Sequence, residues 1–493
     1  MSRSAAPAPQ VWPGLRMGLL ALALAMGGCA THVPQALGPK IVPASFSSEV
    51  PRAQQIWPPR EWWQSFGCPE LSKLIVDAQE QNRDIAVATA RMMQARAQLT
   101  IERSALWPQL NLTAAAQRSG TGANSVSSSQ TIGTSNAGTS NTFGLSAGAS
   151  YGVDIWGLSI ANVRAAREML KSARYAQEST RLSVAAEVAD AYFQILSLRE
   201  RIAIVQEDIA AVQSILDVIK LKVAAGKSSQ LDLTQEQAQM EAIAMQAPLL
   251  KEQELEARAA LAVLLGRVPE QLQISEQNAR SILSPVIAPG IPSELLERRP
   301  DVAEAEAALA AAHADVDAAR VAFLPQFSLT GSAGYASATL NTLIRGPGLL
   351  WDASANLLQT IFDGGKLVGQ LRLAQATQRQ LIASYESAVL NAFADVDIAL
   401  GQVASYSAAE EHLVSEVKAA SEAFQIGQLQ YRQGVADLII VLQAQLTLFS
   451  AQDQLSQAGL SRRQAMVHLY QALGGGWVEP RSERTQLTKQ TGS

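Results

Sequence analysis

The chain contains an internal duplication, and this feature limits its fold more than any other. Residues 103–115 read RSALWPQLNLTAA, and residues 320–332 read RVAFLPQFSLTGS, an offset of 217. Further matched positions follow in the same order in both halves: Ala189-Asp190 with Ala394-Asp395, Gly226 with Gly434, Gln235 with Gln443, and Gly266 with Gly474, the last three pairs at an offset of 208. Self-similarity of this kind predicts two copies of one structural unit.

Each copy changes its hydrophobic period from that of a helix to that of a strand and back. In the first copy, residues 70–107 contain no Pro or Gly and place apolar side chains at helical spacing, which predicts a helix of up to 38 residues. Pro108 ends this helix, and the residues that follow alternate between apolar and polar as far as Ile155. A loop rich in Ser, Gly, Thr and Asn, roughly residues 119–141, divides this stretch into a hairpin.

A very long helix follows the first hairpin. Residues 158–225 span 68 positions without Pro or Gly, and Gly226 ends the run. At about 1.5 Å per residue, such a helix is roughly 100 Å long. A further helix is expected over residues 229–265, with Pro248 bending or breaking it.

The second copy repeats this plan. Pro300 is well placed at the first position of a helix. The sequence Asp363-Gly364-Gly365 is expected to turn the chain from strand to helix, and its glycines need no other role. The expected elements are a helix over 300–323, two strands between 325 and 361, a second helix of 68 residues over 366–433 that Gly434 ends, and a last helix over 435–473.

These lengths constrain the architecture. The two shorter helices of a copy together match the long one, so they can stack end to end beside it. The hairpins carry an apolar face opposite a Ser, Gly, Thr and Asn face, over strand lengths typical of a membrane barrel. One chain supplies four strands, which cannot close, and a membrane sheet cannot keep an open edge. Three chains would supply twelve strands. The larger offset before the long helices places the extra residues in the first hairpin loop.

The first 28 residues have the pattern of an export signal. Arg16 precedes an apolar run, residues 17–26, that is of signal-peptide length and too short to span a bilayer. The run leads into Gly27-Gly28-Cys29, which resembles a bacterial lipobox with Met26 in place of the usual Leu. We therefore expect Cys29 to be acylated and to become the first residue; an ordinary signal peptide with an incidental Cys is the alternative.

Other features of the chain agree with export. Ala30 follows the expected lipid-bearing residue, and the usual sorting pattern of such lipoproteins then favours the outer membrane. If Cys29 carries lipid, no second cysteine is left to form a disulfide with Cys68, so no disulfide is expected. Residues 30–60 are rich in Pro and predict an extended strap. No stretch after residue 28 predicts a transmembrane helix, so the chain is not expected to be an inner-membrane pump.

Charge and histidine content argue against other classes. The net charge of −5 gives no sign of nucleic-acid binding. The four histidines are too scattered for a catalytic triad or a metal cluster, and His313 and His468 are interpreted as ordinary helix-face residues. Gly226-Lys227-Ser228 is similar to the end of a phosphate loop, but Leu221 stands where the first Gly belongs and the loop follows a helix. No enzymatic activity and no cofactor other than a lipid on Cys29 are expected.

Several stretches, taken in order around the duplicated plan, resemble one family. They are EWWQSFGCPELSKLI (61–75) followed by Asn82 and Asp84, LLERRPDVAEAEAAL (295–309), FLPQFSLTGSAG (323–334), QTIFDGGK (359–366) and YRQGVADLIIVLQAQ (431–445). Together they resemble the lipoprotein branch of the TolC/OprM-like outer-membrane efflux factors over about residues 55–477. Two positions depart from the family pattern: Cys68 stands where Asp or Ser is more usual, and Gln443 where Asp is frequent.

The resemblance implies a fold, a function and partners. The fold is mainly α with membrane β: a duplicated helix, hairpin, long helix and helix, assembled as a trimeric twelve-stranded barrel that continues into a periplasmic α-helical barrel. The function is that of a passive exit duct for small molecules such as drugs. The partners are two further copies of the chain, a periplasmic adaptor protein and an inner-membrane transporter of the RND type. The location is the outer membrane.

The resemblance also directs attention to two turns far from the hairpins. The turns after Gly226 and Gly434 should form the periplasmic tip, where the family meets its adaptor and closes its entrance. The expected docking residues are Gly226, Leu231, Gly434 and Leu438. Asp437 is the candidate for a constriction ring that would favour cations; a solvated surface Asp is the alternative. For both glycines a helix C-cap role is expected in any case.

The sequence divides into six expected segments. They are a signal peptide (1–28), a strap (29–60), a first repeat (61–266) with its hairpin at about 108–156, a linker (267–292), a second repeat (293–476) with its hairpin at about 325–363, and a polar tail (477–493). Two other functions stay open at this point. The same fold could serve type I protein secretion, or the chain could be a periplasmic adaptor lipoprotein, although an adaptor would have one helical hairpin and not two copies.

Overall fold

The computed structural model describes residues 57–121, 138–275, 282, 283, 285, 292–344 and 349–477. The chain divides into two compact units, residues 1–42 and 43–493, and all described residues belong to the second. The expected lipid site at Cys29 lies outside the described residues. The helices and strands of the first copy are α2 (Pro69–Gln81), α3 (Arg83–Ser104), β1 (Gln109–Thr121), β2 (Gly138–Val153), α4 (Leu158–Ala224), α5 (Gln230–Ala244) and α6 (Gln246–Leu264). Those of the second copy are α7 (Pro292–Arg298), α8 (Pro300–Val321), β3 (Gln326–Ser337), β4 (Leu349–Leu358), α9 (Lys366–Gln433) and α10 (Leu438–Ala472).

The two long helices, α4 and α9, confirm the sequence prediction. Helix α9 has the predicted 68 residues, and α4 has 67. Asp363 fixes the start of α9, because its carboxylate accepts hydrogen bonds from the backbone N–H groups of Gly365 and Leu367 at 2.9 and 2.8 Å. Gly364 and Gly365 both have positive φ, 70° and 92°, so this strand-to-helix turn accounts for both glycines, as expected.

The helix expected over residues 70–107 is wrong in one respect, because it is two helices. Asn82 lies between α2 and α3 in extended conformation. Its side-chain oxygen accepts hydrogen bonds from the N–H groups of Asp84 and Ile85, at 2.8 and 3.0 Å, and thereby caps α3. Its side-chain nitrogen donates to the carbonyl of Leu264 at 2.8 Å. This last contact brings the end of α6 to the junction of α2 and α3.

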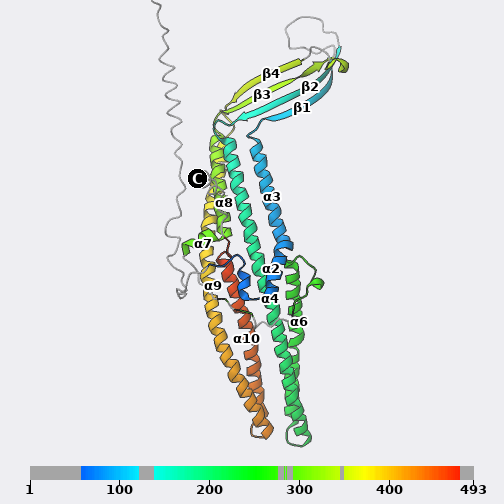
Figure 1. Cartoon of the computed structure of the whole chain (residues 1–493), viewed down its shortest axis with the longest axis vertical. Helices are drawn as coiled ribbons and strands as arrows, with labels where there is room; N and C mark the ends of the chain where they lie inside the picture. The colour runs from blue at the N-terminus through cyan, green and yellow to red at the C-terminus, as the bar shows by residue number, and fades with distance from the viewer. Residues whose placement is uncertain are drawn as a thin grey trace, which may run out of the picture. The chain divides into compact units, whose positions relative to one another are not determined.

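The short helices of the first copy accordingly lie one after the other along α4 (Figure 1). The helix expected over residues 229–265 is broken at Met245, between α5 and α6. The break lies three residues before Pro248, as expected from the missing N–H of Pro. In the second copy α8 and α10 pack against both α4 and α9. Helix α10 begins at Leu438, three residues later than predicted, because residues 435–437 belong to the turn.

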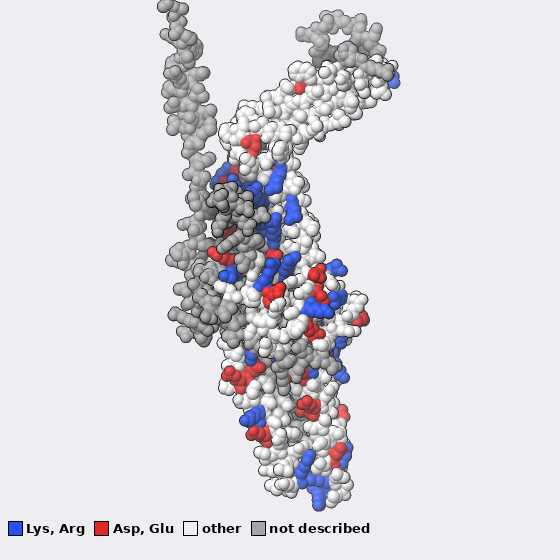
Figure 2. Space-filling view, viewed as in Figure 1, with Lys and Arg blue, Asp and Glu red and all other residues white. Residues whose placement is uncertain are grey.

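The strands form one antiparallel sheet in the order β1-β2-β3-β4. Each predicted hairpin is present, and the two hairpins join through β2 and β3, with Ala149 opposite Gly331. Leu112 and Trp351 are each 75% exposed, and Figure 2 shows few charged residues over the sheet on the face in view. The return strand ends at Leu358, so Ile361, expected within it, lies beyond the sheet. Among the described residues, strands β1 and β4 each have one neighbouring strand, which leaves two edges of the sheet unpaired there.

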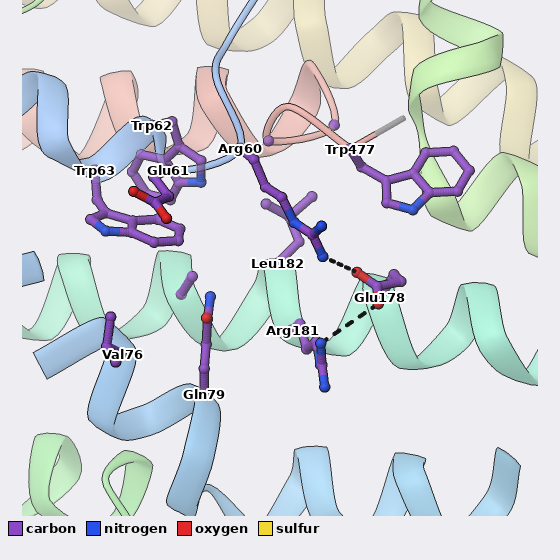
Figure 3. A pocket seen from close by; sticks show the side chains of 13 residues that line it. Arg60, Glu61, Trp62, Trp63, Val76, Gln79, Glu178, Arg181, Leu182 and Trp477 are labelled. Carbon is purple, nitrogen blue, oxygen red and sulfur yellow. Dashed lines mark ion pairs between the residues drawn. The ribbon is translucent and has the colours of Figure 1, made fainter. Parts of the chain in front are cut away.

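A core of aromatic side chains joins the first and last described segments. Trp62 stacks on Tyr470 with ring centroids 5.0 Å apart, and Phe66 lies 5.2 Å from Phe193 of α4. A cavity lies next to this core, where Arg60 and Arg181 both pair with Glu178 at 3.7 Å (Figure 3). The Arg60–Glu178 pair joins the start of the described chain to α4, whereas the Arg181–Glu178 pair lies within α4.

Cys68, unusual for the family at its position, caps α2. Its sulfur accepts a hydrogen bond from the N–H of Leu71 at 3.4 Å and lies 3.4 Å from the hydroxyl of Tyr192. That hydroxyl donates to Glu70 at 2.8 Å. Ser and Asp are preferred residues at a helix N-cap. The Ser or Asp that is usual in the family at this position and the thiol of Cys68 can therefore fill the same role as N-cap of α2.

Candidate functional site: the two turns at the helix ends

The turns that follow α4 and α9 lie at the ends of these helices opposite the sheet (Figure 1). A common apolar cluster joins them, which we name the tip cluster. Its buried members are Ile215, Ile219, Tyr431, Leu438, Val441 and Leu442, with Val218, Val223, Leu233 and Phe424 packed against it. Because these residues come from α4, α5, α9 and α10, the two copies of the repeat meet in one small core at this end of the helices.

Both turns use the same backbone motif. Gly226 has φ +65°, and the N–H groups of Gly226 and Lys227 donate to the carbonyls of Val223 and Lys222 at 2.9 and 2.7 Å. This is a Schellman motif, which uses a left-handed residue to satisfy the last carbonyls of a helix. A Cβ placed on Gly226 would meet no atom within 4 Å.

Gly434 has the same geometry. Its φ is +79°, and its N–H and that of Val435 donate to the carbonyls of Tyr431 and Gln430 at 3.1 and 2.9 Å. A Cβ on Gly434 would also meet no atom within 4 Å. The expected C-cap role is therefore confirmed for both glycines, and the backbone conformation alone explains why each position is glycine.

The two turns differ in the way the next helix starts. Ser229 and Asp232 form a capping box at the start of α5, with hydrogen bonds of 2.9 and 3.1 Å between each side chain and the other residue's N–H. Asp437 occupies the equivalent position at the start of α10, but its side chain makes no capping hydrogen bond and is exposed. The carboxylate of Asp437 therefore differs from that of Asp232 in making no hydrogen bond to the start of its helix.

The remaining sequence-predicted residues separate into exposed and buried positions. Leu231 is 63% exposed, whereas Leu438 is 6% exposed and belongs to the tip cluster. Leu438 thus holds the turn in place and does not present its side chain to solvent. Val435 and Ile439, which sequence reasoning did not single out, are 75% and 54% exposed beside Asp437. The sequence showed that both residues are apolar, but not that they are exposed.

Lys222 connects the two turns directly. Its Nζ donates a hydrogen bond of 2.6 Å to the backbone carbonyl of Tyr431 and lies 3.6 Å from the centroid of the Tyr431 ring. A cation at the C-terminal end of a helix and over an aromatic face is favourable in both respects. Lysine is common in the last turn of helices, so nothing in the sequence marked Lys222 as a link between the copies.

The alternative sites considered from the sequence do not assemble. Gly226-Lys227-Ser228 lies between two helices and not after a strand. His468 pairs with Asp190 at 3.0 Å on the face between α10 and α4. Over the described ranges, no group of three or more His, Cys, Asp or Glu side chains is placed to hold a metal ion. Within the same residues, no helix combines the length and the hydropathy that crossing a membrane requires.

Comparison with known proteins supplies the identity of this arrangement. The model of the family described as outer membrane efflux protein matches residues 74–267 and 291–475, which is one match for each copy of the repeat. The chain belongs to the outer membrane efflux protein family. It is 36% identical over 465 residues to the pyoverdine export outer membrane protein OpmQ of Pseudomonas putida, with 93% of this chain and 97% of the relative covered.

Other outer-membrane proteins match a similar share of the chain at lower identity. The outer membrane protein OprJ of Pseudomonas aeruginosa is 30% identical over 472 residues, covering 95% of this chain and 98% of its own. The solved structure of the outer-membrane channel OprN matches with a TM-score of 0.83 at 26% identity, covering 91% of this chain and all of that one. The open state of the Neisseria gonorrhoeae MtrE outer membrane channel matches with a TM-score of 0.81 at 28% identity, covering 92% and 100%. The fold is therefore that of outer-membrane efflux channels, mainly α with membrane β, and the family is one of transport proteins.

Proposed function

We propose that this chain is the passive exit duct of a tripartite efflux pump and carries out no chemistry of its own. The observation that carries the proposal is the single sheet with two unpaired edges, joined to helices of about 100 Å that end in two linked turns. A sheet in a membrane must close on itself. Three copies, each supplying four strands, would close a twelve-stranded barrel, so we propose a homotrimer.

The second part of the proposal concerns partners at the helix turns. The turns at Gly226 and Gly434, with the exposed Leu231, would contact a periplasmic adaptor, which in turn would bind an inner-membrane transporter of the RND type. Leu438 would contribute by holding the second turn in shape. Asp437, exposed and not used as a cap, would converge with its copies at the trimer axis and favour cations there.

The third part concerns the cargo and the anchor. Relatives of this chain are named for the export of pyoverdine and of toluene, so we propose small organic molecules as cargo. Type I protein secretion is the less favoured function, because the named relatives belong to efflux of small compounds. A covalent lipid on Cys29 would attach the chain to the outer membrane in addition to its sheet.

Two measurements test this proposal. The detergent-extracted protein should have the mass of a trimer; a monodisperse folded monomer would contradict the architecture. Gly434→Val should give normally abundant trimer with lost dye efflux and weakened cross-linking to the adaptor, because a β-branched residue resists positive φ. Gly369→Val is the matched control, because Gly369 lies in α9 without positive φ and a Cβ added there would meet no described atom within 4 Å. Full efflux and unchanged cross-linking in Gly434→Val would remove this turn from the docking surface.

A further inference from the structure

Helix α5 places a carboxyl group at a position that is otherwise apolar. Leu233, Met240 and Ile243 lie on one face of α5, where Leu233 packs on the tip cluster and the other two on the next cluster along α4. Glu236 is three residues after Leu233 and seven before Ile243, which is the spacing of the same face. It is 0% exposed. Glu236 therefore occupies a core position between two apolar clusters.

The buried carboxyl has no hydrogen-bond partner among the described residues. Neither oxygen of Glu236 makes a hydrogen bond within that part of the chain. An ionised carboxylate without a partner is very costly to bury, whereas the neutral acid costs much less. Burial accordingly raises the pKa of Glu236 to about 7.

The charged groups around Glu236 do not compensate an ionised carboxylate. On α4, Lys222 is engaged with the carbonyl of Tyr431, and Lys220 pairs with Asp217 at 3.2 Å on the surface. On α5 itself, Asp232 is held in the capping box. Further ionisable groups on the packed elements are the exposed Lys251 and Glu252 of α6, the exposed Asp437 before α10, and Tyr431 and the exposed Arg432 of α9. Among the described residues, no neighbouring charge contributes to the shift in the pKa of Glu236.

We propose that Glu236 is a pH-dependent switch that controls the packing of α5 at the tip. The neutral carboxyl allows α5 to stay packed on α4 and the tip cluster, and loss of its proton makes the opening of α5, which exposes the carboxylate to water, more frequent. The switch belongs to the first copy alone. The matched position of α10, 208 residues after Glu236, is Ala444, which cannot ionise. This proposal goes beyond the duct function, and it does not depend on which compounds the duct exports.

The test is amide hydrogen exchange of the full-length trimer at pH 6 and pH 8, expressed as protection factors so that the intrinsic pH dependence of exchange is removed. With a pKa of about 7 in the packed state and 4.5 when exposed, the opening of α5 should be about tenfold more populated at pH 8 than at pH 6. Protection over residues 230–244 should therefore fall about tenfold.

Three variants decide whether Glu236 is responsible. Glu236→Gln should give the same protection at both pH values, and Glu236→Leu should do so with higher protection than the native chain. Glu241→Gln removes an exposed acid of the same helix and should keep the native pH response. Unchanged native protection between pH 6 and pH 8 would overturn the proposal. So would a tenfold change that persists in Glu236→Gln; if that variant does not fold, the same result in Glu236→Leu decides.

Discussion

The four glycines that are matched between the two copies all have positive φ. Gly226 and Gly434 lie in open space, whereas Gly266 and Gly474 are enclosed by other segments. Gly434 has φ +79°, and a Cβ added there would meet no described atom within 4 Å. Gly474 has φ +82°, but a Cβ added there would lie 1.9 Å from the carbonyl oxygen of Arg298. The backbone conformation is thus nearly identical and the packing is opposite. Substitution of each by alanine separates the cost of conformation from the cost of packing.

The expected magnitudes follow from these two terms. An L-residue in the left-handed region costs about 1–2 kcal/mol, and alanine recovers about 0.4–1 kcal/mol by restricting the unfolded chain. Gly434→Ala should therefore cost about 1 kcal/mol. Gly474→Ala carries this cost and in addition must displace the backbone at Arg298, for which overpacking costs about 1–3 kcal/mol. We expect about 3 kcal/mol in total.

Scanning calorimetry of the purified protein measures the difference. At roughly 2.1 cal/mol/K of unfolding entropy per residue, a chain of 493 residues shifts its Tm by about 1 °C per kcal/mol. Gly474→Ala should lower Tm by about 3 °C and Gly434→Ala by about 1 °C. The matched pair of the first copy supplies a repetition, because a Cβ on Gly266 would lie 2.4 Å from the carbonyl oxygen of Gln81 and one on Gly226 would touch nothing. Equal shifts within either pair would refute the packing argument.

Four further predictions concern single side chains. Cys68→Ser should raise the free energy of unfolding by up to about 1 kcal/mol, because a hydroxyl is a better N-cap than a thiol; calorimetry showing a loss of stability equal to that of Cys68→Ala would contradict this. Asp208, 7% exposed, has its pKa raised by burial and by Glu207 from 3.8 to about 7, so stability should fall as pH rises between these values, and Asp208→Asn should remove up to about 3 kcal/mol of the fall that calorimetry measures between pH 5 and pH 8. Lys222→Met should keep the trimer and lower the exchange protection of residues 424–442, because the bond to the Tyr431 carbonyl is lost; unchanged protection argues against the link. Cys29→Ser should abolish metabolic palmitate labelling, and persistent labelling would assign the lipid elsewhere.

The parts of the fold that the sequence predicted well are those set by local backbone chemistry. Helix α9 begins and ends where the glycines at 365 and 434 predicted, because only glycine adopts their positive φ without strain. Pro248 predicted the break before α6 for a similarly local reason. These residues act through the conformation of their own chain segment, so no knowledge of neighbours was needed.

The parts that were missed depend on neighbours distant in sequence. Asn82 interrupts a helix that contains no Pro or Gly, and half of its role is a hydrogen bond to Leu264, 182 residues away. Leu438 follows Asp437 in an apolar turn and resembled a docking residue, but Ile215 and Tyr431 bury it. Periodicity indicates which residues are apolar, not which of them another copy of the repeat covers.

The duplication also separates what the two copies share from what distinguishes them. The matched glycines keep the same φ sign and the same packing class in both copies. The matched acids do not keep the same partner: Asp395 pairs with Arg299 at 3.0 Å, and Asp190 pairs with His468 at 3.0 Å. Arginine is permanently charged, whereas histidine is charged only when protonated, although the hydrogen bond to Asp190 raises the pKa of His468.

The same contrast recurs at the turns. The second helix of the first copy starts with a capping box, and the equivalent Asp437 of the second copy is left exposed. The backbone plan therefore repeats because both copies need the same long helices and tight turns to join the sheet to the tip. Side chains at matched positions are under no such constraint. Differences between the copies at the tip and at the ion pairs are consequently where regulation and partner choice can reside without disturbing the fold.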